Sequence, residues 1–322
     1  MGLYGKDSKS HKDFVAVEHS RSCVSKCNFC VLWRQLGRTD AKGNFQLAYR
    51  TKSVNRTFEE VQMLHEKYKR KTFCWVDPTF NVSSKSCSDF ADRIIAEGLD
   101  IHHTAWYRAD TTIRDHKNGT LKKMVDAGLR QAMIGLERTD KVELESLEKN
   151  YTLEMLRECF GALQQYPQVL TVATYIYGLP DETPQSLRRF YKDLRTIPFD
   201  FGLAIPLTPN PGGIYAEDQK FDDLIEIHNY DFYNFINPVM RTHSMSRRKL
   251  EREMIKQEWS MHVKKDFWRY FHPWSKDRRE RAFFRLSKSK RKVFAKMLRN
   301  QTINRLTGRE ENYNIKPEWY DD

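Results

Sequence analysis

The chain has 322 residues, of which 39% are hydrophobic and 30% charged, a composition that suits a globular protein with a sizeable core. Its six cysteines are few for its length and no apolar run is long enough to span a bilayer, which excludes a disulfide-stapled scaffold and a membrane-spanning protein. Because residues 1–12 are polar and charged, we expect no secretory signal and a cytoplasmic location.

The net charge of +12 is confined to one end of the chain. Residues 241–322 contain 23 Lys and Arg against 11 Asp and Glu, whereas the first 240 residues contain 32 of each sign. A neutral body with a basic C-terminal region suits an acidic small substrate, an anionic membrane surface or an acidic protein at least as well as a nucleic acid.

Six short runs rich in β-forming residues alternate with helical patterns, which predicts βα units around a parallel sheet. The expected strands are Phe14–His19, Thr72–Asp77, Ile101–Tyr107, Gln131–Leu136, Leu170–Tyr177 and Phe199–Leu207. The expected helices are Thr57–Lys69, Lys85–Glu97, Thr120–Ala127, Thr152–Gln165 and Pro184–Thr196, with caps at Thr57 and Thr152. We therefore predict an α/β fold, a partial (β/α)6 barrel of the TIM type with its functional groups at the C-terminal ends of the strands.

The pattern changes after about residue 220, where alternating strands stop and long helical, aromatic and basic segments begin. In Arg247–Phe271, apolar residues recur at roughly helical spacing, which predicts a helix with one apolar face that packs on the barrel. We expect two domains, a barrel over residues 1–220 and a helical C-terminal extension over residues 221–322.

Three cysteines directly follow the first predicted strand, in the run Cys-Val-Ser-Lys-Cys-Asn-Phe-Cys. Cys23, Cys27 and Cys30 can place three thiolates around one iron–sulfur cluster and leave one iron open to an outside ligand. A zinc site is the alternative, but it needs a fourth Cys or His at short spacing, and none follows. The other cysteines, Cys74, Cys87 and Cys159, lie in apolar stretches and are expected to be core thiols.

The cysteine spacing, three residues and then two, resembles the signature of the radical S-adenosylmethionine (SAM) superfamily. The resemblance implies that Cys23, Cys27 and Cys30 bind a 4Fe-4S cluster and that SAM binds the open iron. It also implies that Phe29 lies beside the adenine of SAM, and that reductive cleavage of SAM yields a 5′-deoxyadenosyl radical.

Five segments at predicted strand ends resemble, in order and spacing, those of the cobalamin-associated branch of this superfamily. They are Asp77-Pro78-Thr79-Phe80-Asn81, Trp106-Tyr107-Arg108-Ala109-Asp110, Gly135-Leu136-Glu137-Arg138, Tyr177-Gly178-Leu179-Pro180-Asp181-Glu182-Thr183 and Leu207-Thr208-Pro209-Asn210-Pro211-Gly212.

The residue types in these segments suit contacts with SAM. Arg108 can donate paired hydrogen bonds to its carboxylate, and Glu137 can accept from ribose hydroxyls or the amino group. Asp77 is placed to do likewise, and Gly178 lets backbone approach a ligand closely. The alternative is that Asp77, Arg108 and Glu137 form a structural ion-pair network at the mouth of the barrel.

The C-terminal region resembles that of the anaerobic magnesium-protoporphyrin monomethyl ester cyclase, in Tyr230–Phe235, Pro238–Met240 and the segment ending at Trp274. This resemblance implies a tetrapyrrole substrate held over the barrel mouth. Tyr233 and Phe235 would stack on the flat ring, while Arg247 and Arg248 would pair with its propionates. Peripheral membrane docking by the same charges is the competing account.

One departure from the cyclase is the missing Asp-x-His-x-x-Gly signature of its N-terminal cobalamin-binding domain. Without that domain, this chain resembles the cobalamin-free tetrapyrrole enzymes of about its size that oxidise the C-7 methyl of bacteriochlorophyllide c to a formyl group. Such an enzyme implies an electron donor such as flavodoxin or ferredoxin.

The first alternative is a cobalamin-dependent methyltransferase or cyclase whose cobalamin domain is another chain. The second is a nucleic-acid modifying enzyme that uses the basic region, although no RNA-recognition motif supports it, and we expect no nucleic-acid partner.

Overall fold

The computed structural model describes residues 14–43 and 45–261 and contains two compact units. The first comprises the described residues up to 175 together with 197–203. The second comprises 176–196 and the described residues from 204 onward. The predicted domain boundary near residue 220 stays a prediction.

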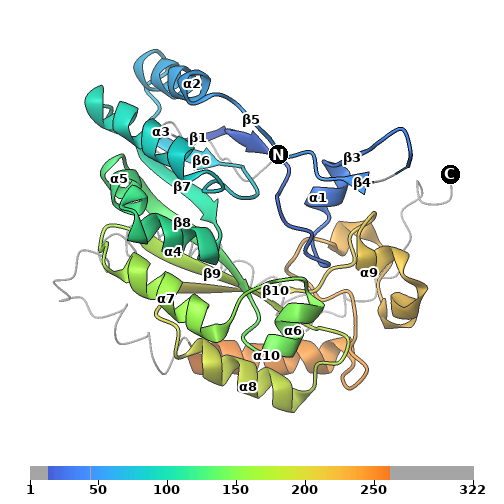
Figure 1. Cartoon of the computed structure of the whole chain (residues 1–322). Helices are drawn as coiled ribbons and strands as arrows, with labels where there is room; N and C mark the ends of the chain where they lie inside the picture. The colour runs from blue at the N-terminus through green and yellow to red at the C-terminus, as the bar shows by residue number, and fades with distance from the viewer. Residues whose placement is uncertain (1–13, 44, 262–322) are drawn as a thin grey trace. The chain divides into compact units, whose positions relative to one another are not determined.

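A six-stranded sheet forms the centre of the fold (Figure 1). Its strands are β1 (Phe14–Val17), β6 (Thr72–Trp75), β7 (His102–Tyr107), β8 (Leu129–Glu137), β9 (Leu170–Tyr177) and β10 (Phe201–Pro206), and they lie side by side in that order. Each pairing from β1 to β9 is parallel. The predicted α/β architecture is confirmed, and no predicted strand end is displaced by more than two residues.

Helices of the first unit line one face of this sheet in Figure 1 and contact one another. They are α2 (Val54–Glu66), α3 (Ser84–Ala96), α4 (Ala109–Lys117), α5 (Thr120–Asp126) and α7 (Leu153–Gln164). The unit also contains two short strand pairs, β2 (Ser20–Arg21) with β5 (Arg50–Thr51) and β3 (Arg38–Thr39) with β4 (Phe45–Gln46). Two short helices, α1 (Leu32–Gln35) and α6 (Lys141–Ser146), lie between strands in the sequence.

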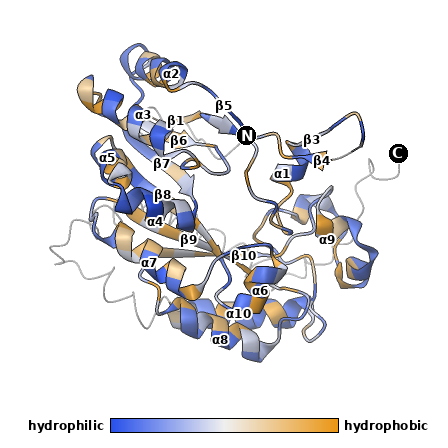
Figure 2. Ribbon diagram, viewed as in Figure 1, coloured by the Kyte–Doolittle hydropathy of each residue, from blue (hydrophilic) through white to orange (hydrophobic). Residues whose placement is uncertain are grey.

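Burial along the strands explains which faces are covered. All eight residues of β9 are buried, as expected for a parallel strand with cover on both faces, and Figure 2 shows its hydrophobic character. In β7 burial alternates, so that His103, Ala105 and Tyr107 are buried while Thr104 and Trp106 are half-buried.

Side-chain caps fix the helix starts, and one predicted cap is wrong. The Thr152 hydroxyl accepts a hydrogen bond from Met155 N at 3.2 Å and caps α7, as predicted. In α2 the cap is Ser53 instead of Thr57, because the helix begins one turn earlier than its acidic residues suggest. Thr57 is buried within α2, and its hydroxyl lies 2.8 Å from His19 Nδ1.

The second unit is built around α8 (Pro184–Leu194) and α10 (Arg247–Met261), which pack together. The Tyr191 hydroxyl donates to Glu258 Oε1 at 2.5 Å, and Arg195 Nη2 donates to Ser260 Oγ at 3.2 Å. The short helices α9 (Ile214–Glu217), η2 (Gln219–Leu224) and η3 (Tyr230–Phe232) lie between them in the sequence.

The predicted helix from Arg247 is confirmed as far as Met261, and residues 262–271 lie outside the described residues. Leu250 and Met261 are buried, whereas Trp259 is 70% exposed and does not lie on a buried apolar face as expected. Over residues 14–43 and 45–261, no helix combines the length and the apolar character needed to cross a membrane.

An aromatic cluster between sheet and helices surrounds a buried histidine. Trp75, Phe80 and Phe90 pack with ring centroids 4.8–6.5 Å apart, and the His103 ring lies 6.5 Å from those of Trp75 and Phe80. Burial lowers the pKa of His103 to about 3, with a smaller contribution from the nearby Arg130. The imidazole is therefore neutral in the folded protein at every ordinary pH.

We expect His103 to make the fold sensitive to acid. The unfolded chain binds a proton at this histidine below about pH 6.5, whereas the folded chain does so only near pH 3, so stability is lost as the pH falls between these values. At pH 5 the loss is about 2 kcal/mol of unfolding free energy relative to neutral pH. Urea unfolding should show the full acid loss in the native chain and in an exposed control, His243→Leu. In His103→Leu the loss should be smaller by about 2 kcal/mol, with a remainder because the pKa values of His19 and His102 are also lowered. Equal losses in all three would contradict the assignment.

Candidate functional site

The loop that carries Cys23, Cys27 and Cys30, residues 22–31, is folded by its own backbone. Cys30 N donates to Cys27 O at 3.1 Å, which closes a turn between the second and third cysteines. The indole N–H of Trp33, at the start of α1, donates to the same carbonyl at 2.9 Å. The turn therefore holds Cys27 and Cys30 close to one another within a short loop.

The cysteine loop is tied to the segment that follows α6. Asn28 N donates to Leu147 O at 3.3 Å, and Asn28 Nδ2 donates to Ser146 O at 2.7 Å. Asn28 directly follows Cys27, so these hydrogen bonds hold Cys27 next to the chain around residue 147.

Burial affects the ionisation of two of the three thiols. Burial raises the pKa of Cys27 to about 11 and raises that of Cys30, so neither thiol ionises readily at neutral pH without a bound cation. Among the described residues, no three His, Cys, Asp or Glu side chains converge as the ligands of a single metal ion would. Three thiols in one loop, spaced three residues and then two apart, are the ligand set of a 4Fe-4S cluster that leaves one iron open.

Asp77, which follows β6, fixes the entry to the cysteine loop. The carboxylate is fully buried, and its Oδ2 accepts from His19 N at 3.1 Å while its Oδ1 accepts from Ser20 N and, at 2.5 Å, from Ser20 Oγ. Burial raises the pKa of Asp77, and the hydrogen bonds from Ser20 and His19 oppose that rise. Both oxygens are engaged within the chain, an arrangement that favours a structural role; contact of Asp77 with SAM stays a prediction.

Arg108, which follows β7, spans two parts of the site. It donates two hydrogen bonds to Asp110, at 3.0 Å from Nε and 2.8 Å from Nη2. Its Nη1 donates to the hydroxyl of Ser25, in the cysteine loop. The guanidinium is one-fifth exposed, so it can still reach a ligand.

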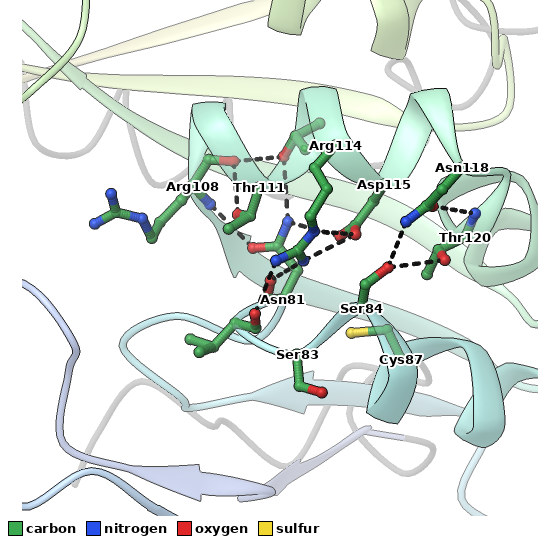
Figure 3. Close-up of polar contacts among 12 residues, drawn as sticks. Asn81, Ser83, Ser84, Cys87, Arg108, Thr111, Arg114, Asp115, Asn118 and Thr120 are labelled. Carbon is green, nitrogen blue, oxygen red and sulfur yellow. Dashed lines mark hydrogen bonds and ion pairs between the residues drawn. The ribbon is translucent and has the colours of Figure 1, made fainter.

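A polar network holds the backbone of Arg108 (Figure 3). Arg108 N donates to Asn81 Oδ1 at 3.1 Å, and Asn81 Nδ2 donates to the buried Asp115 at 3.2 Å. Arg114 pairs with Asp115 at 2.8 Å and donates to the carbonyls of Asn81 and Val82. Figure 3 shows the Arg108 side chain directed away from this network, which leaves its guanidinium to the cysteine loop.

Glu137 ends β8 in a distorted conformation and pairs with a lysine. Two residues of β8 oppose one residue of β9 between Gly135 and Glu137, and Glu137 has a φ of 64°. Its carboxylate lies 3.3 Å from Lys149 Nζ, and Lys149 also donates to Gly135 O at 3.2 Å. The Glu137 and Lys149 side chains are only 9% and 11% exposed, which makes this a buried ion pair.

A cavity of about 460 Å³ opens beside these groups. Its wall includes Ser25 of the cysteine loop, the cations Lys26, Arg108 and Lys149, and two glutamates, Glu145 and Glu148. A cavity with cations and anions on its wall suits a ligand that has both a carboxylate and an ammonium group.

Comparison with known proteins decides the family. A model of the Radical SAM superfamily matches residues 17–194, which include the cysteine loop, Asp77, Arg108 and the Glu137–Lys149 pair. The chain belongs to the radical SAM superfamily. It is therefore an enzyme, and its cofactors are a 4Fe-4S cluster and SAM.

Two curated relatives match more than two-thirds of the chain. It is 28% identical over 228 residues to an uncharacterized methyltransferase of Pyrococcus horikoshii, which covers 71% of this chain and 47% of that protein. It is 25% identical over 264 residues to the anaerobic magnesium-protoporphyrin IX monomethyl ester cyclase of Rubrivivax gelatinosus, which covers 82% of this chain and 44% of that enzyme. The chain spans about half the length of these relatives.

Solved structures show the same fold. The structure of OxsB, a cobalamin-dependent SAM radical enzyme with aqua-cobalamin and SAM bound, matches with a TM-score of 0.57 at 14% identity. The match covers 88% of this chain and 46% of that one. It confirms the predicted partial barrel of the radical SAM enzymes.

Two further predicted site residues, Phe29 and Gly178, lie in different units of the structure. Phe29 is half-buried in the cysteine loop. Gly178, in the second unit, has a φ of 84° and donates from its N–H to Glu182 Oε2 at 2.6 Å. Its left-handed backbone explains the glycine, since most side chains are strained there. Ligand contact by Phe29 and Gly178 stays a prediction.

The predicted substrate residues all lie in the second unit. The Tyr233 hydroxyl donates to Ile227 O at 3.1 Å, and Arg247 Nε lies 3.6 Å from Glu226 with its side chain 15% exposed. Phe235 is 50% exposed, and Arg248 is exposed. Phe235 and Arg248 are thus the two of the four that present the most surface, and the substrate role of all four stays a prediction.

Replacement of Cys23, Cys27 and Cys30 together by Ala should abolish cluster binding, because no other described cysteine lies in this loop. Cys87 and Cys159 are buried in the core, as predicted, and Cys74 is half-buried. Iron and sulfide analysis after anaerobic reconstitution is the measurement, with Cys74→Ala as the control that keeps its cluster. A full complement of cluster iron in the triple variant would refute the assignment.

Arg108→Ala should weaken SAM binding about tenfold, the effect of losing one charge-assisted hydrogen bond to a carboxylate. Glu137→Gln should also weaken SAM binding, while both variants keep the absorption spectrum of the cluster. Calorimetric titration with SAM measures the affinity, and Arg157→Ala on the exposed face of α7 is the matched control. Native affinity in both variants would leave only the structural ion-pair interpretation.

Proposed function

We propose that this radical SAM enzyme oxidises a methyl group of a chlorophyll-pathway tetrapyrrole to a formyl group, with the C-7 methyl of bacteriochlorophyllide c as the first candidate. The proposal that the substrate is a tetrapyrrole rests on the match with the magnesium-protoporphyrin IX monomethyl ester cyclase. That match extends over 264 residues, more than the span 17–194 contains, so the likeness reaches beyond the region that the superfamily model covers.

The reaction balances with SAM as the oxidant. Bound to the cluster, SAM supplies a 5′-deoxyadenosyl radical that removes one hydrogen atom from the methyl group. In each round one C–H bond is replaced by C–OH, the oxygen comes from water, and SAM is reduced to methionine and 5′-deoxyadenosine. The electron that enters to cleave SAM is returned when the substrate carbon is oxidised. Two rounds give a geminal diol, which loses water to leave the aldehyde.

The chain's own groups serve the binding of SAM and substrate. Cations on the cavity wall, Lys26, Arg108 and Lys149, can hold the carboxylate of SAM next to the cysteine loop. In the second unit, the exposed ring of Phe235 offers apolar area to a flat substrate, and Arg248 offers a charge to a propionate. We propose a one-electron donor such as flavodoxin or ferredoxin as the protein partner.

Anaerobic turnover tests this function. The full chain, reconstituted with its cluster and reduced by dithionite, should convert bacteriochlorophyllide c in the presence of SAM to a product that has gained one oxygen and lost two hydrogens. Two molecules of 5′-deoxyadenosine should form per aldehyde, and isotopically labelled water should label the oxygen. SAM cleavage without any modified chlorin or porphyrin, across a panel that includes magnesium-protoporphyrin monomethyl ester, would reject the substrate.

Phe235→Ala and Arg248→Gln should each weaken tetrapyrrole binding several-fold, since each loses one contact of about 1 kcal/mol. Quenching of chlorin fluorescence on titration measures the affinity. Tyr68→Ala, which removes another exposed aromatic ring at the end of α2, is the control. If both variants bind the tetrapyrrole with native affinity, the substrate binds elsewhere.

The second candidate is methyl transfer, because the relative from Pyrococcus horikoshii is named a methyltransferase. It predicts that the chain binds a corrinoid or a corrinoid protein and that the product gains a methyl group. Gel filtration after incubation with hydroxocobalamin, followed by the visible spectrum of the protein peak, separates it from the first candidate.

A further inference from the structure

Lys149 is a buried cation that the sequence patterns did not single out. Its ammonium lies 3.3 Å from Glu137 Oε1 and 3.2 Å from Gly135 O, and 5.0 Å from the centroid of the Tyr151 ring. The side chain is 11% exposed. Burying a lysine to this extent costs folding free energy unless its charge is paired.

The backbone at Glu137 is held in an unfavourable conformation. Glu137 has a φ of 64° and is not glycine. A left-handed conformation of this kind costs about 1 kcal/mol or more and persists where the surrounding structure imposes it, often at functional sites. Glu148, directly before Lys149, has a φ of 54° because it lies just past the C-terminal end of α6, where Lys149 N donates to Leu144 O at 2.9 Å.

The pair lies beside the cysteine loop. Asn28, the neighbour of Cys27, is hydrogen-bonded to the chain at Ser146 and Leu147, two residues before Lys149. Lys149 also shares the 460 Å³ cavity with Ser25.

Burial makes this charge effective over the short distance. Burial alone would lower the pKa of Lys149, but the Glu137 carboxylate raises it above its ordinary value, so the ammonium stays charged. A fixed charge away from water acts through a low dielectric and is poorly screened by salt. A positive charge next to a cluster favours the state with one more electron.

We propose that Lys149, held in place by Glu137, keeps a positive charge beside Cys27 and thereby raises the reduction potential of the cluster. Glu137 then has two effects: it orients the ammonium, and its own negative charge partly offsets that of Lys149. The proposal concerns the ease of one-electron reduction and is independent of which substrate the enzyme modifies.

The experiment is a redox titration of the reconstituted full chain, followed by electron paramagnetic resonance, without SAM or substrate. Lys149→Met should make one-electron reduction about tenfold less favourable, which is about 59 mV. Lys149→Arg, which keeps the charge, should stay near the native potential. Lys141→Met, which removes an exposed lysine on α6, is the matched control and should leave the potential unchanged.

Lys149→Met leaves Glu137 buried without its partner and can lose the fold. A second comparison therefore sets the single variant Glu137→Gln against the double variant Glu137→Gln/Lys149→Met. Both partners are neutral in the double variant, so the two variants differ in the charge at position 149. Glu137→Gln should make reduction easier than in the native chain, and the double variant should reverse this. A change of less than twofold in the reduction equilibrium for these comparisons, or an equal change in Lys141→Met, would overturn the proposal. Failure to modify a tetrapyrrole would not affect it.

Discussion

The position of the cysteine loop depends on the buried carboxylate of Asp77. It accepts hydrogen bonds from two consecutive backbone N–H groups, those of His19 and Ser20, at the point where the chain leaves β1. Buried backbone donors need partners, and the carboxylate of Asp77, just after the adjacent strand β6, satisfies both. The loop therefore starts from a fixed point on the sheet, and Asn28 fixes it again beside Leu147.

The charged groups at the strand ends are satisfied by partners within the chain. Arg108 is paired with Asp110 and Glu137 with Lys149, so the interpretation as an ion-pair network and the interpretation as ligand contacts are compatible. A ligand that pairs with these groups needs charges of both signs, and the Arg108 side chain is one-fifth exposed and can reach one. SAM, with its carboxylate and ammonium groups, meets this condition in a cavity that contains charges of both signs.

The sequence was sufficient for the fold and for the cysteine loop because both leave short-range patterns. Alternating runs marked every strand of the main sheet, and the spacing of Cys23, Cys27 and Cys30 is a local signature. Lys149 could not be found in this way, because its role depends on a bulge in β8 and a left-handed residue before it, neither of which has a residue-type signal here. The cap at Thr57 was misassigned because Ser53 and Thr57, one turn apart, carry the same kind of hydroxyl signal.

The small size of Gly135 leaves room for the ion pair. A Cβ built on Gly135 would lie too close to the Glu137 carboxylate and come within 3.2 Å of Lys149 Nζ. Both contacts are with the ends of flexible side chains, so a larger residue at position 135 would displace the carboxylate and the ammonium rather than the backbone. The geometry of the Glu137–Lys149 pair therefore depends on the absence of a side chain at position 135.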